Sequence, residues 1–320
     1  MNLGEVYGVL PDALRYPLQR VPEPVQAHLE EIRIRVGRPL EIGTSRGFYF
    51  VGSRGGIDKV PRGAVVPTPE DGKILLGRLS QHSLYALEEE LQSGFLTLAG
   101  GHRVGLTGRT VGVVGGRYRL RDITGFNIRI ARSCPHCSRS LLPHLVQNQR
   151  LHNTLLLSPP QAGKTTLLRD LARSLSLGSS LIPSLKVSMV DERSELAGCY
   201  AGIPQYDIGP RTDVLDGCPK MIGLMMLIRS MSPEVLVIDE LGHPSEIRAL
   251  HEASQAGVRI VATAHAFSYR SAKQRPSFSP LFQSKIFTRI VLLSRREGPG
   301  TVERIYDHLG QEITGGNRVS

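Results

Sequence analysis

The residues best suited to chemistry lie in the stretch LLLSPPQAGKTTLLRD, residues 155–170. Gly163, Lys164 and Thr165 close a short loop, and an amphipathic helical pattern follows them. In such a loop, backbone N–H groups bind phosphate, the lysine reaches the β- and γ-phosphates, and the threonine hydroxyl is a ligand for Mg²⁺. The pattern therefore predicts a binding site for a nucleoside triphosphate and Mg²⁺.

The first position of this loop departs from the usual pattern, because Ser158 stands where glycine is common. We expect a modest loss of affinity, since this position only lets the chain leave its strand, and the two prolines that follow stiffen the turn. The alternative is a degenerate loop, or a chance Gly-Lys-Thr at a strand–helix junction. The residues expected to contact the nucleotide are Ser158, Pro159, Pro160, Gln161, Ala162, Gly163, Lys164, Thr165 and Thr166.

A second motif, PEVLVIDELG at residues 233–242, places two acids after a short apolar run. In an open α/β sheet the carboxyl ends of the strands are where ligands bind. We expect Asp239 to hold Mg²⁺ through water and Glu240 to polarise the attacking water. The acid pair could instead cap a helix, although its position after a phosphate loop favours the first interpretation.

Two further strand ends carry polar groups. SMVDERSE brings Asp191, Glu192 and Arg193, and VATAHA brings Thr263 and His265. We expect His265 to contact the γ-phosphate, with a hydrogen-bonded structural histidine as the alternative. A strand inserted between the phosphate-loop strand and the Asp-Glu strand is typical of ASCE ATPases, which also have a catalytic glutamate.

These motifs require a sheet to position them, and the pattern from residue 151 onward predicts one. Short apolar strands alternate with helices, which indicates an α/β, mainly parallel sheet with helices on both faces, the RecA-like P-loop NTPase fold. A hairpin with Gly298-Pro299-Gly300 as its turn closes the chain. The expected strands span 153–158, 185–191, 234–240, 259–265 and 285–295, and the expected helices span 165–177, 219–231 and 244–257.

The first half predicts a smaller α+β domain. We place it at residues 1–150 and the ATPase domain at 151–320. A helix is expected within residues 67–94, with Thr68 as its N-cap and Asp71 completing a capping box. The expected strands lie within residues 31–43, 47–52, 95–100, 102–108 and 126–132.

The composition indicates which kinds of binding partner and which cellular location to expect. The net charge of +10 would suit an anionic partner, but no compact basic run appears, which favours an ordinary solvated surface. The start lacks the features of a signal peptide, and no apolar run approaches the length that spans a bilayer. We therefore expect a cytoplasmic protein whose membrane contact, if any, is peripheral.

The cysteines and methionines favour ordinary structural roles over a metal site or a docking surface. The CPHC segment offers Cys134 and Cys137, with His136 or His144, as zinc ligands, but a structural zinc site needs four ligands, so ordinary thiols are favoured. The methionines of the helix at 219–231 are expected in its core, with a docking surface as the alternative.

A family resemblance adds to these expectations. Two segments closely resemble the stage III sporulation AA family, a branch of the type II and type IV secretion ATPases. They are VDERSELAGCYAGIPQYDIGPRTDVLDGCPK and LMMLIRSMSPEVLVIDELG. EIRIRVGRPLEI and GFLTLAGGHRVGLTGR resemble its N-terminal domain. The resemblance implies a hexameric, cytoplasmic ATPase that uses ATP and Mg²⁺ to power a secretion-like membrane complex around the developing spore. It also makes VDERSE an Asp box and TAHA a His box.

The resemblance leaves two roles open. The family's carboxylate at the Mg²⁺ strand falls on Glu240, but its Asp-box acids also act in catalysis, so Glu192 competes as the general base; we favour Glu240. Ring ATPases complete each site with arginines from a neighbour or from the N-terminal domain. The candidates are Arg103, Arg129, Arg211 and Arg229, of which Arg103 and Arg211 are favoured because they lie among glycines.

Two other classes of function remain as alternatives. One is an ATPase associated with single-stranded nucleic acid, which we disfavour because no basic strand interleaved with aromatic residues and no appended binding domain is found. The other is a nucleotide-binding scaffold that does not hydrolyse ATP, which the substitution at Ser158 motivates.

Overall fold

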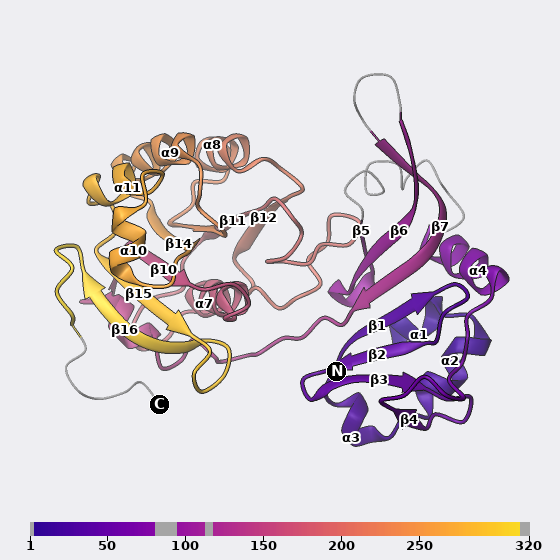
Figure 1. Cartoon of the computed structure of the whole chain (residues 1–320). Coiled ribbons are helices and arrows are strands. Elements are labelled where there is room, and N and C mark those ends of the chain that lie inside the picture. Colours follow the sequence, from indigo (N-terminus) through magenta and orange to yellow (C-terminus); the bar gives the residue numbers. More distant parts are fainter. Residues whose placement is uncertain (1–2, 81–94, 113–117, 314–320) are drawn as a thin grey trace. The chain divides into compact units, whose positions relative to one another are not determined.

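The computed structural model describes residues 3–80, 95–112 and 118–313 (Figure 1). The chain divides into two compact units, Met1–Arg132 and Ser133–Ser320. Each unit has its own hydrophobic core. None of the helices in this described part of the chain has the length and apolar character needed to cross a bilayer.

The first unit is built on an antiparallel sheet. Its strand order is β4-β3-β2-β1-β7-β6-β5. Alternate residues such as Ile32, Ile34, Val104 and Ile128 are fully buried, as the period-two pattern requires. The strands are β1 (Leu29–Arg35), β2 (Glu41–Thr44), β3 (Gly47–Val51), β4 (Ile57–Asp58), β5 (Phe95–Thr97), β6 (Arg103–Gly112) and β7 (Tyr118–Arg129).

Helices bury the apolar residues of this sheet. Sequence analysis did not anticipate the short helices that precede β1. The capping box of α4 is confirmed, because the Thr68 hydroxyl accepts from the Asp71 backbone N–H and the Asp71 carboxylate accepts from that of Thr68. The rest of the predicted helix, 81–94, lies outside the described residues. The helices are α1 (Gly4–Val9), α2 (Asp12–Gln19), α3 (Glu23–Gln26) and α4 (Pro69–Leu79), and Ala99–Gly101 form a 3₁₀ turn.

The second unit contains the predicted mainly parallel sheet. Its strand order is β12-β11-β13-β14-β10-β15-β16, and among its described strands only the β15–β16 pair is antiparallel. The strand inserted between the phosphate-loop strand and the Asp-Glu strand is β14. The strands are β10 (Thr154–Ser158), β11 (Val187–Asp191), β12 (Thr212–Asp216), β13 (Val235–Ile238), β14 (Arg259–His265), β15 (Arg289–Ser294) and β16 (Thr301–Asp307).

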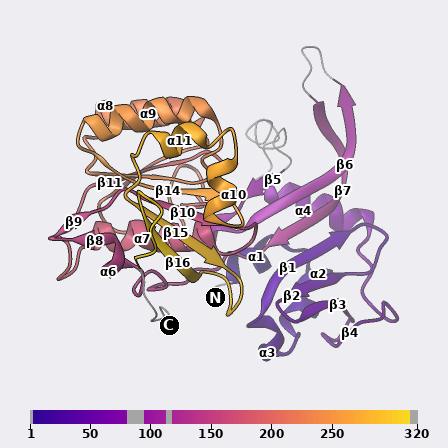
Figure 2. The same cartoon turned by 60° about the vertical axis from the view of Figure 1, so that its left-hand side comes forward.

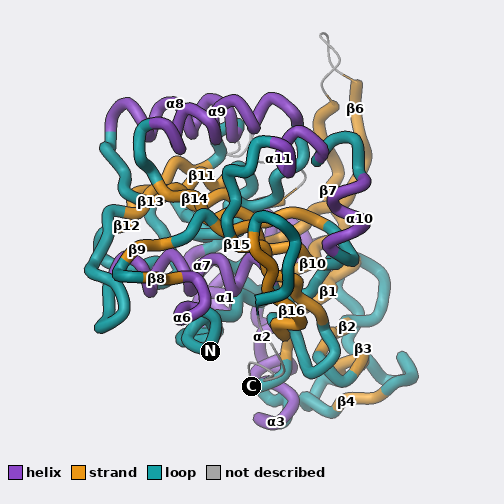
Figure 3. Tube along the Cα trace, turned by 90° about the vertical axis from the view of Figure 1, so that its left-hand side faces the viewer, coloured by secondary structure: helices purple, strands orange, loops and turns teal. Residues whose placement is uncertain are grey.

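Helices cover both faces of this sheet, which explains why its strands are apolar runs without alternation. Figure 3 shows α7 on one face, with α8, α9 and α11 on the other. Along β13, Val235 and Val237 pack on the α7 side, and Leu236 and Ile238 pack on the α8–α9 side. The helices are α7 (Lys164–Leu177), α8 (Lys220–Ser230), α9 (Pro244–Gln255), α10 (Tyr269–Gln274) and α11 (Ser279–Gln283).

At one end of the sheet the structure has a strand that was not predicted, and at the other end it has the predicted hairpin. The edge strand β12 was missed, because its sequence TDVLD has neither an apolar run nor a clean alternation. The predicted β15–β16 hairpin is confirmed (Figure 2). Its turn glycines Gly298 and Gly300 both have positive φ.

The boundary between the units lies near Arg132 rather than near residue 150. Residues 133–150, assigned to the first domain from sequence, include α6 (Leu142–Leu145), β8 (Val146–Gln147) and part of a small hairpin with β9 (Arg150–Leu151). The buried Asp170 on α7 accepts hydrogen bonds from the backbone N–H groups of His136 (2.9 Å) and Ser138 (2.8 Å) and from the Ser138 hydroxyl (2.6 Å). This contact fixes the segment to the second unit.

We predict that Asp170→Ala lowers the free energy of unfolding by about 3 kcal/mol, because the buried Arg173 loses its nearest carboxylate, 3.1 Å away. Burial raises the pKa of Asp170, but the Ser138, His136 and Arg173 contacts lower it further, to below its ordinary value. Its contribution is therefore present above pH 4 and is lost as the pH falls through the folded-state pKa.

The measurement is urea unfolding at pH 7 and at acidic pH. Asp207→Ala is the matched control, because Asp207 is 72% exposed and lies 3.9 Å from the same arginine. We expect the control to change stability by less than about 1 kcal/mol. Equal effects of the two substitutions would contradict the role given to Asp170.

Candidate nucleotide site

The predicted site residues converge at the carboxyl edge of the second sheet. In parallel strands all carboxyl ends lie at one edge, so β10, β13 and β14 deliver the phosphate loop, the Asp239-Glu240 pair and His265 to the same place. Ser158 pairs with His265 across β10 and β14, and Ile238 lies beside Ala262 across β13 and β14. The order of the strands thus brings together motifs that are far apart in the sequence.

The phosphate loop connects β10 to α7 without a glycine at its first position. Ser158 is fully buried, its backbone is bound into the sheet edge by the Ala266 N–H (3.0 Å), and its hydroxyl donates to the Pro159 carbonyl (3.0 Å). Serine is therefore accommodated as a strand residue. Gln161 has a φ of +59° within the loop, a backbone conformation that favours glycine.

The turn of the β15–β16 hairpin packs directly against the phosphate loop. The Gly300 N–H donates to the Ala162 carbonyl (2.8 Å). Gly163 has a φ of +78°, and a Cβ there would lie 3.0 Å from both the Gly300 nitrogen and the Pro299 side chain. The hairpin turn therefore leaves little room for a side chain at position 163.

The lysine and threonine of the loop contact the two acids after β13. Lys164 Nζ donates to Glu240 Oε1 at 2.7 Å, and the Thr165 hydroxyl donates to Asp239 Oδ2 at 2.8 Å. The lysine side chain is 9% exposed and that of Glu240 is 27% exposed, so solvent screens this ion pair weakly. The hydroxyl and carboxylate oxygens of Thr165 and Asp239 are the hard donors that Mg²⁺ prefers, so this pair fits the predicted metal.

Glu240 is held in an unusual backbone conformation, with a φ of +57°. Its N–H donates to the Thr263 hydroxyl (2.8 Å), and that hydroxyl donates to Asp239. Thr263 is fully buried on the inserted strand β14, so it links the two acids to the sheet. Residues outside favoured φ regions persist only where their surroundings hold them, and they concentrate at functional sites.

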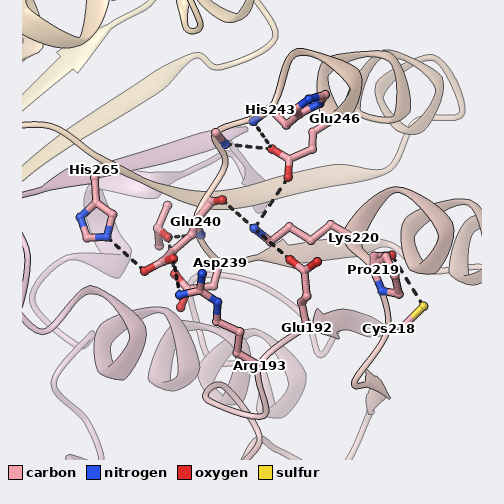
Figure 4. Close-up of polar contacts among 12 residues, drawn as sticks. Glu192, Arg193, Cys218, Pro219, Lys220, Asp239, Glu240, His243, Glu246 and His265 are labelled. Atoms are coloured by element: carbon pink, nitrogen blue, oxygen red, sulfur yellow. Dashed lines mark hydrogen bonds and ion pairs between the residues drawn. The ribbon is translucent and has the colours of Figure 1, made fainter. Parts of the chain in front are cut away.

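Several basic groups surround the Glu240 carboxylate. His265 Nε2 lies 3.1 Å from Oε1, and Arg193 Nη1 lies 3.4 Å from Oε2 (Figure 4). Burial raises the pKa of Glu240, but the hydrogen bonds and charges of Lys164 and then His265 lower it further, to about 2. The His265 Nδ1 atom is buried and has no hydrogen-bond partner among the residues that the structure describes.

Asp191 and Glu192, which precede Arg193 in the Asp box, contact groups other than the Glu240 carboxylate. Asp191 is buried, and its carboxylate accepts from the backbone N–H groups of Glu195 and Ala197, both at 2.8 Å. It therefore shapes its own turn. Glu192 is 41% exposed, and its carboxylate lies 3.4 Å from Lys220 Nζ (Figure 4). Lys220 was missed from sequence, because nothing in the CPK segment distinguishes it from a surface lysine.

The two candidate arginines of the second unit, Arg211 and Arg229, lie away from this cluster. Arg211 precedes β12 at the opposite, amino-terminal edge of the sheet, and its guanidinium donates to the Ser184 carbonyl (3.0 Å). Arg229 is exposed on the last turn of α8. Arg103 and Arg129 belong to the first unit, where Arg103 stacks on the Phe95 ring at 4.0 Å. Neither Arg211 nor Arg229 therefore completes the site within its own unit.

The structure shows the surroundings of the CPHC cysteines and of the methionines on α8. Within the described residues, no three or more Cys, His, Asp or Glu side chains gather where they could hold a metal ion. Cys137 packs beside the Thr166 carbonyl of α7, and Cys134 is exposed. On α8, Met221 and Met225 pack against the core, but Met226 is 50% exposed, so the expectation that the methionines are buried holds only in part.

Comparison with known sequences points to one family. The family model described as "Sporulation stage III, protein AA" matches residues 3–313. Stage III sporulation protein AA of Bacillus subtilis (strain 168) is 48% identical over 312 residues, which are 98% of this chain and 97% of that protein. Protein SEEDLING PLASTID DEVELOPMENT 1 of Arabidopsis thaliana is 28% identical over 167 residues, or 52% of this chain and 23% of that protein.

Comparison with solved structures shows the fold. The Legionella pneumophila ATPase DotB aligns with a TM-score of 0.51 and 15% identity, covering 84% of this chain and 73% of that one. The pilus retraction motor PilT, solved with bound ADP, aligns with a TM-score of 0.50 and 15% identity, covering 84% and 75%. The predicted P-loop ATPase fold class is confirmed.

We predict that Gly163→Ala lowers the free energy of unfolding by about 2–3 kcal/mol, because alanine disfavours the positive φ and its Cβ meets the hairpin turn. Gly300→Ala is the matched control: its φ is +89°, but a Cβ there has nothing within 4 Å. We expect the control to cost only about 1 kcal/mol. Urea unfolding measures both, and equal losses would show that the hairpin contact has no effect.

Proposed function

The chain belongs to the sporulation stage III protein AA family, and from this premise we propose that it is a cytoplasmic, Mg²⁺-dependent ATPase. We propose further that hydrolysis energises the assembly of, or transport through, a secretion-like membrane complex during spore formation. The observation that carries the enzymatic part is the contact of Lys164 with Glu240 (2.7 Å) beside that of Thr165 with Asp239 (2.8 Å). The contacts support the proposal because the four residues to which we assign phosphate binding, metal binding and base catalysis lie in one cluster.

ATP would bind through the backbone of the loop and through the first residues of α7. The backbone N–H groups of residues 162–165 receive the phosphates at the start of α7, where the helix dipole favours negative charge. Thr165 and Asp239 would hold Mg²⁺, which supplies charge neutralisation on the phosphate oxygens. The γ-phosphate and the Glu240 carboxylate compete for Lys164, since both are anions within reach of the same ammonium group.

That competition sets the basicity of Glu240. A carboxylate with a pKa of about 2 is a weak general base, and Lys164 is the largest of the groups that lower it. When the phosphates draw Lys164 away, the pKa of Glu240 rises and the carboxylate becomes a better acceptor for a water proton. His265, on the neighbouring strand, then lies beside both the acid and the γ-phosphate.

The assembled form is proposed to be a hexameric ring in which arginines from a neighbouring subunit or from the N-terminal unit complete each site. Arg103 and Arg211 are the favoured candidates. Arg211 supports this proposal by its place at the edge of the sheet opposite to Lys164, where its guanidinium cannot serve the site of its own unit. We do not propose nucleic acid as a partner.

The first test is phosphate release from MgATP by the purified protein over a range of protein concentrations. We expect turnover that rises with concentration and falls at least about 100-fold in Glu240→Gln and in Lys164→Ala. Glu252→Gln is the control, because Glu252 lies on α9 and pairs with the exposed Arg248 at 3.4 Å. Binding of a fluorescent ATP analogue should persist in Glu240→Gln and weaken in Lys164→Ala.

Absence of turnover with nucleotide still bound would support a non-hydrolysing scaffold instead. Turnover that does not depend on Glu240 would contradict the assignment of the base.

A subunit-mixing experiment tests the shared site. Arg211→Ala and Glu240→Gln proteins should each be inactive, but their mixture should recover activity, because some interfaces then combine an intact acid with an intact arginine. The same experiment with Arg103→Ala compares the two candidates. If no mixture recovers activity, while mixing of the subunits is verified by fluorescence energy transfer, the arginine does not act across the interface.

A further inference from the structure

Lys220 occupies a defined position beside the candidate active site. It is the first residue of α8, directly after Pro219, and its side chain is only 15% exposed. The Gly217 N–H donates to the Asp191 carbonyl (2.9 Å), so the chain that enters α8 is fixed to the end of β11. The lysine side chain consequently reaches over the carboxyl edge of the sheet (Figure 4).

The ammonium group of Lys220 links three elements of the fold. It donates a hydrogen bond to the backbone carbonyl of Glu240 at 2.7 Å. It also forms ion pairs with Glu192 after β11, at 3.4 Å, and with Glu246 on α9, at 3.7 Å. A lysine has three N–H donors and no acceptor, so one hydrogen bond and two ion pairs match its full capacity.

The shortest of these contacts, from Lys220 to the Glu240 carbonyl, holds a residue with an unusual backbone conformation. Glu240 has a φ of +57°, its N–H is held by the Thr263 hydroxyl, and its carbonyl is held by Lys220. The peptide groups on both sides of its Cα are therefore fixed. This conformation directs the carboxylate toward Lys164 and His265.

The same lysine separates the two acids that compete for the role of base. The Glu192 carboxylate and the backbone carbonyl of Glu240 both face Lys220 (Figure 4). The Glu240 carboxylate instead contacts Lys164. Glu246 does not need the lysine for its own place, because its carboxylate accepts from the Gly242 (2.9 Å) and His243 (3.0 Å) N–H groups.

We propose that Lys220 is a positioning residue for ATP hydrolysis, which holds the Glu240 backbone so that its carboxylate serves as the base, and which engages Glu192 so that it does not. This inference rests on the proposed ATPase function. It assigns Lys220 no contact with the nucleotide. A change at Lys220 should therefore act on the rate of hydrolysis rather than on nucleotide binding.

The test compares Lys220→Met, which keeps the length of the side chain but removes its donors, with Lys220→Arg, which keeps donors and charge. In Lys220→Met we expect kcat to fall about 10-fold or more, with KM for ATP and the affinity for a fluorescent ADP analogue within about 3-fold of the parent. Lys220→Arg should recover part of kcat. Glu192→Gln should keep most of the activity, and Lys273→Met, at an exposed position on α10, is the control.

A second measurement does not depend on turnover. Hydrogen exchange should be faster in Lys220→Met at the amides of residues 240–243, which donate to Thr263 and Glu246, and unchanged within α7. If the parent protein hydrolyses ATP but Lys220→Met keeps full kcat, the inference fails and the proposed function stands. If the parent shows no turnover, the proposed function fails, and unchanged exchange at residues 240–243 would overturn the inference as well.

Discussion

The ion pair between Lys164 and Glu240 is the interaction on which the arrangement of the candidate site depends. Its two ends lie 76 residues apart in the chain, and they meet because β14 is inserted between the strands that carry them. The buried Thr263 fixes the acids from that inserted strand, and α7 presents the lysine from its first turn. The pair also holds the pKa of the Glu240 carboxyl well below its ordinary value, and in the proposed function this pKa rises once phosphate engages the lysine.

Much of this arrangement follows from the sequence, because its determinants are local. Strands covered on both faces are apolar runs, so β10, β11, β13 and β14 are recognisable without any knowledge of their neighbours. The capping box at Thr68 and the hairpin turn at Gly298–Gly300 depend on residues within a few positions of one another. The polar residues after these strands could be assigned to one site, because parallel strands end at the same edge.

The features that escaped prediction are set by contacts between distant segments. The edge strand β12 is defined by pairing with β11, not by its own composition. The boundary between the units depends on Asp170, which holds residues 136 and 138 to α7. Asp191 could not be distinguished from Glu192 by sequence, although one is buried in its own turn and the other pairs with Lys220. In each case the deciding partner lies on another element.

The contact between the hairpin turn and the phosphate loop has a consequence for the order in which the protein matures on the ribosome. Ala162 and Gly163 are synthesised long before Gly300, whose N–H completes the loop. A nascent chain that ends before the hairpin lacks this support, as well as the β15 strand that flanks β10. The loop between β10 and α7 therefore gains these supporting contacts only after the β15–β16 hairpin has been synthesised.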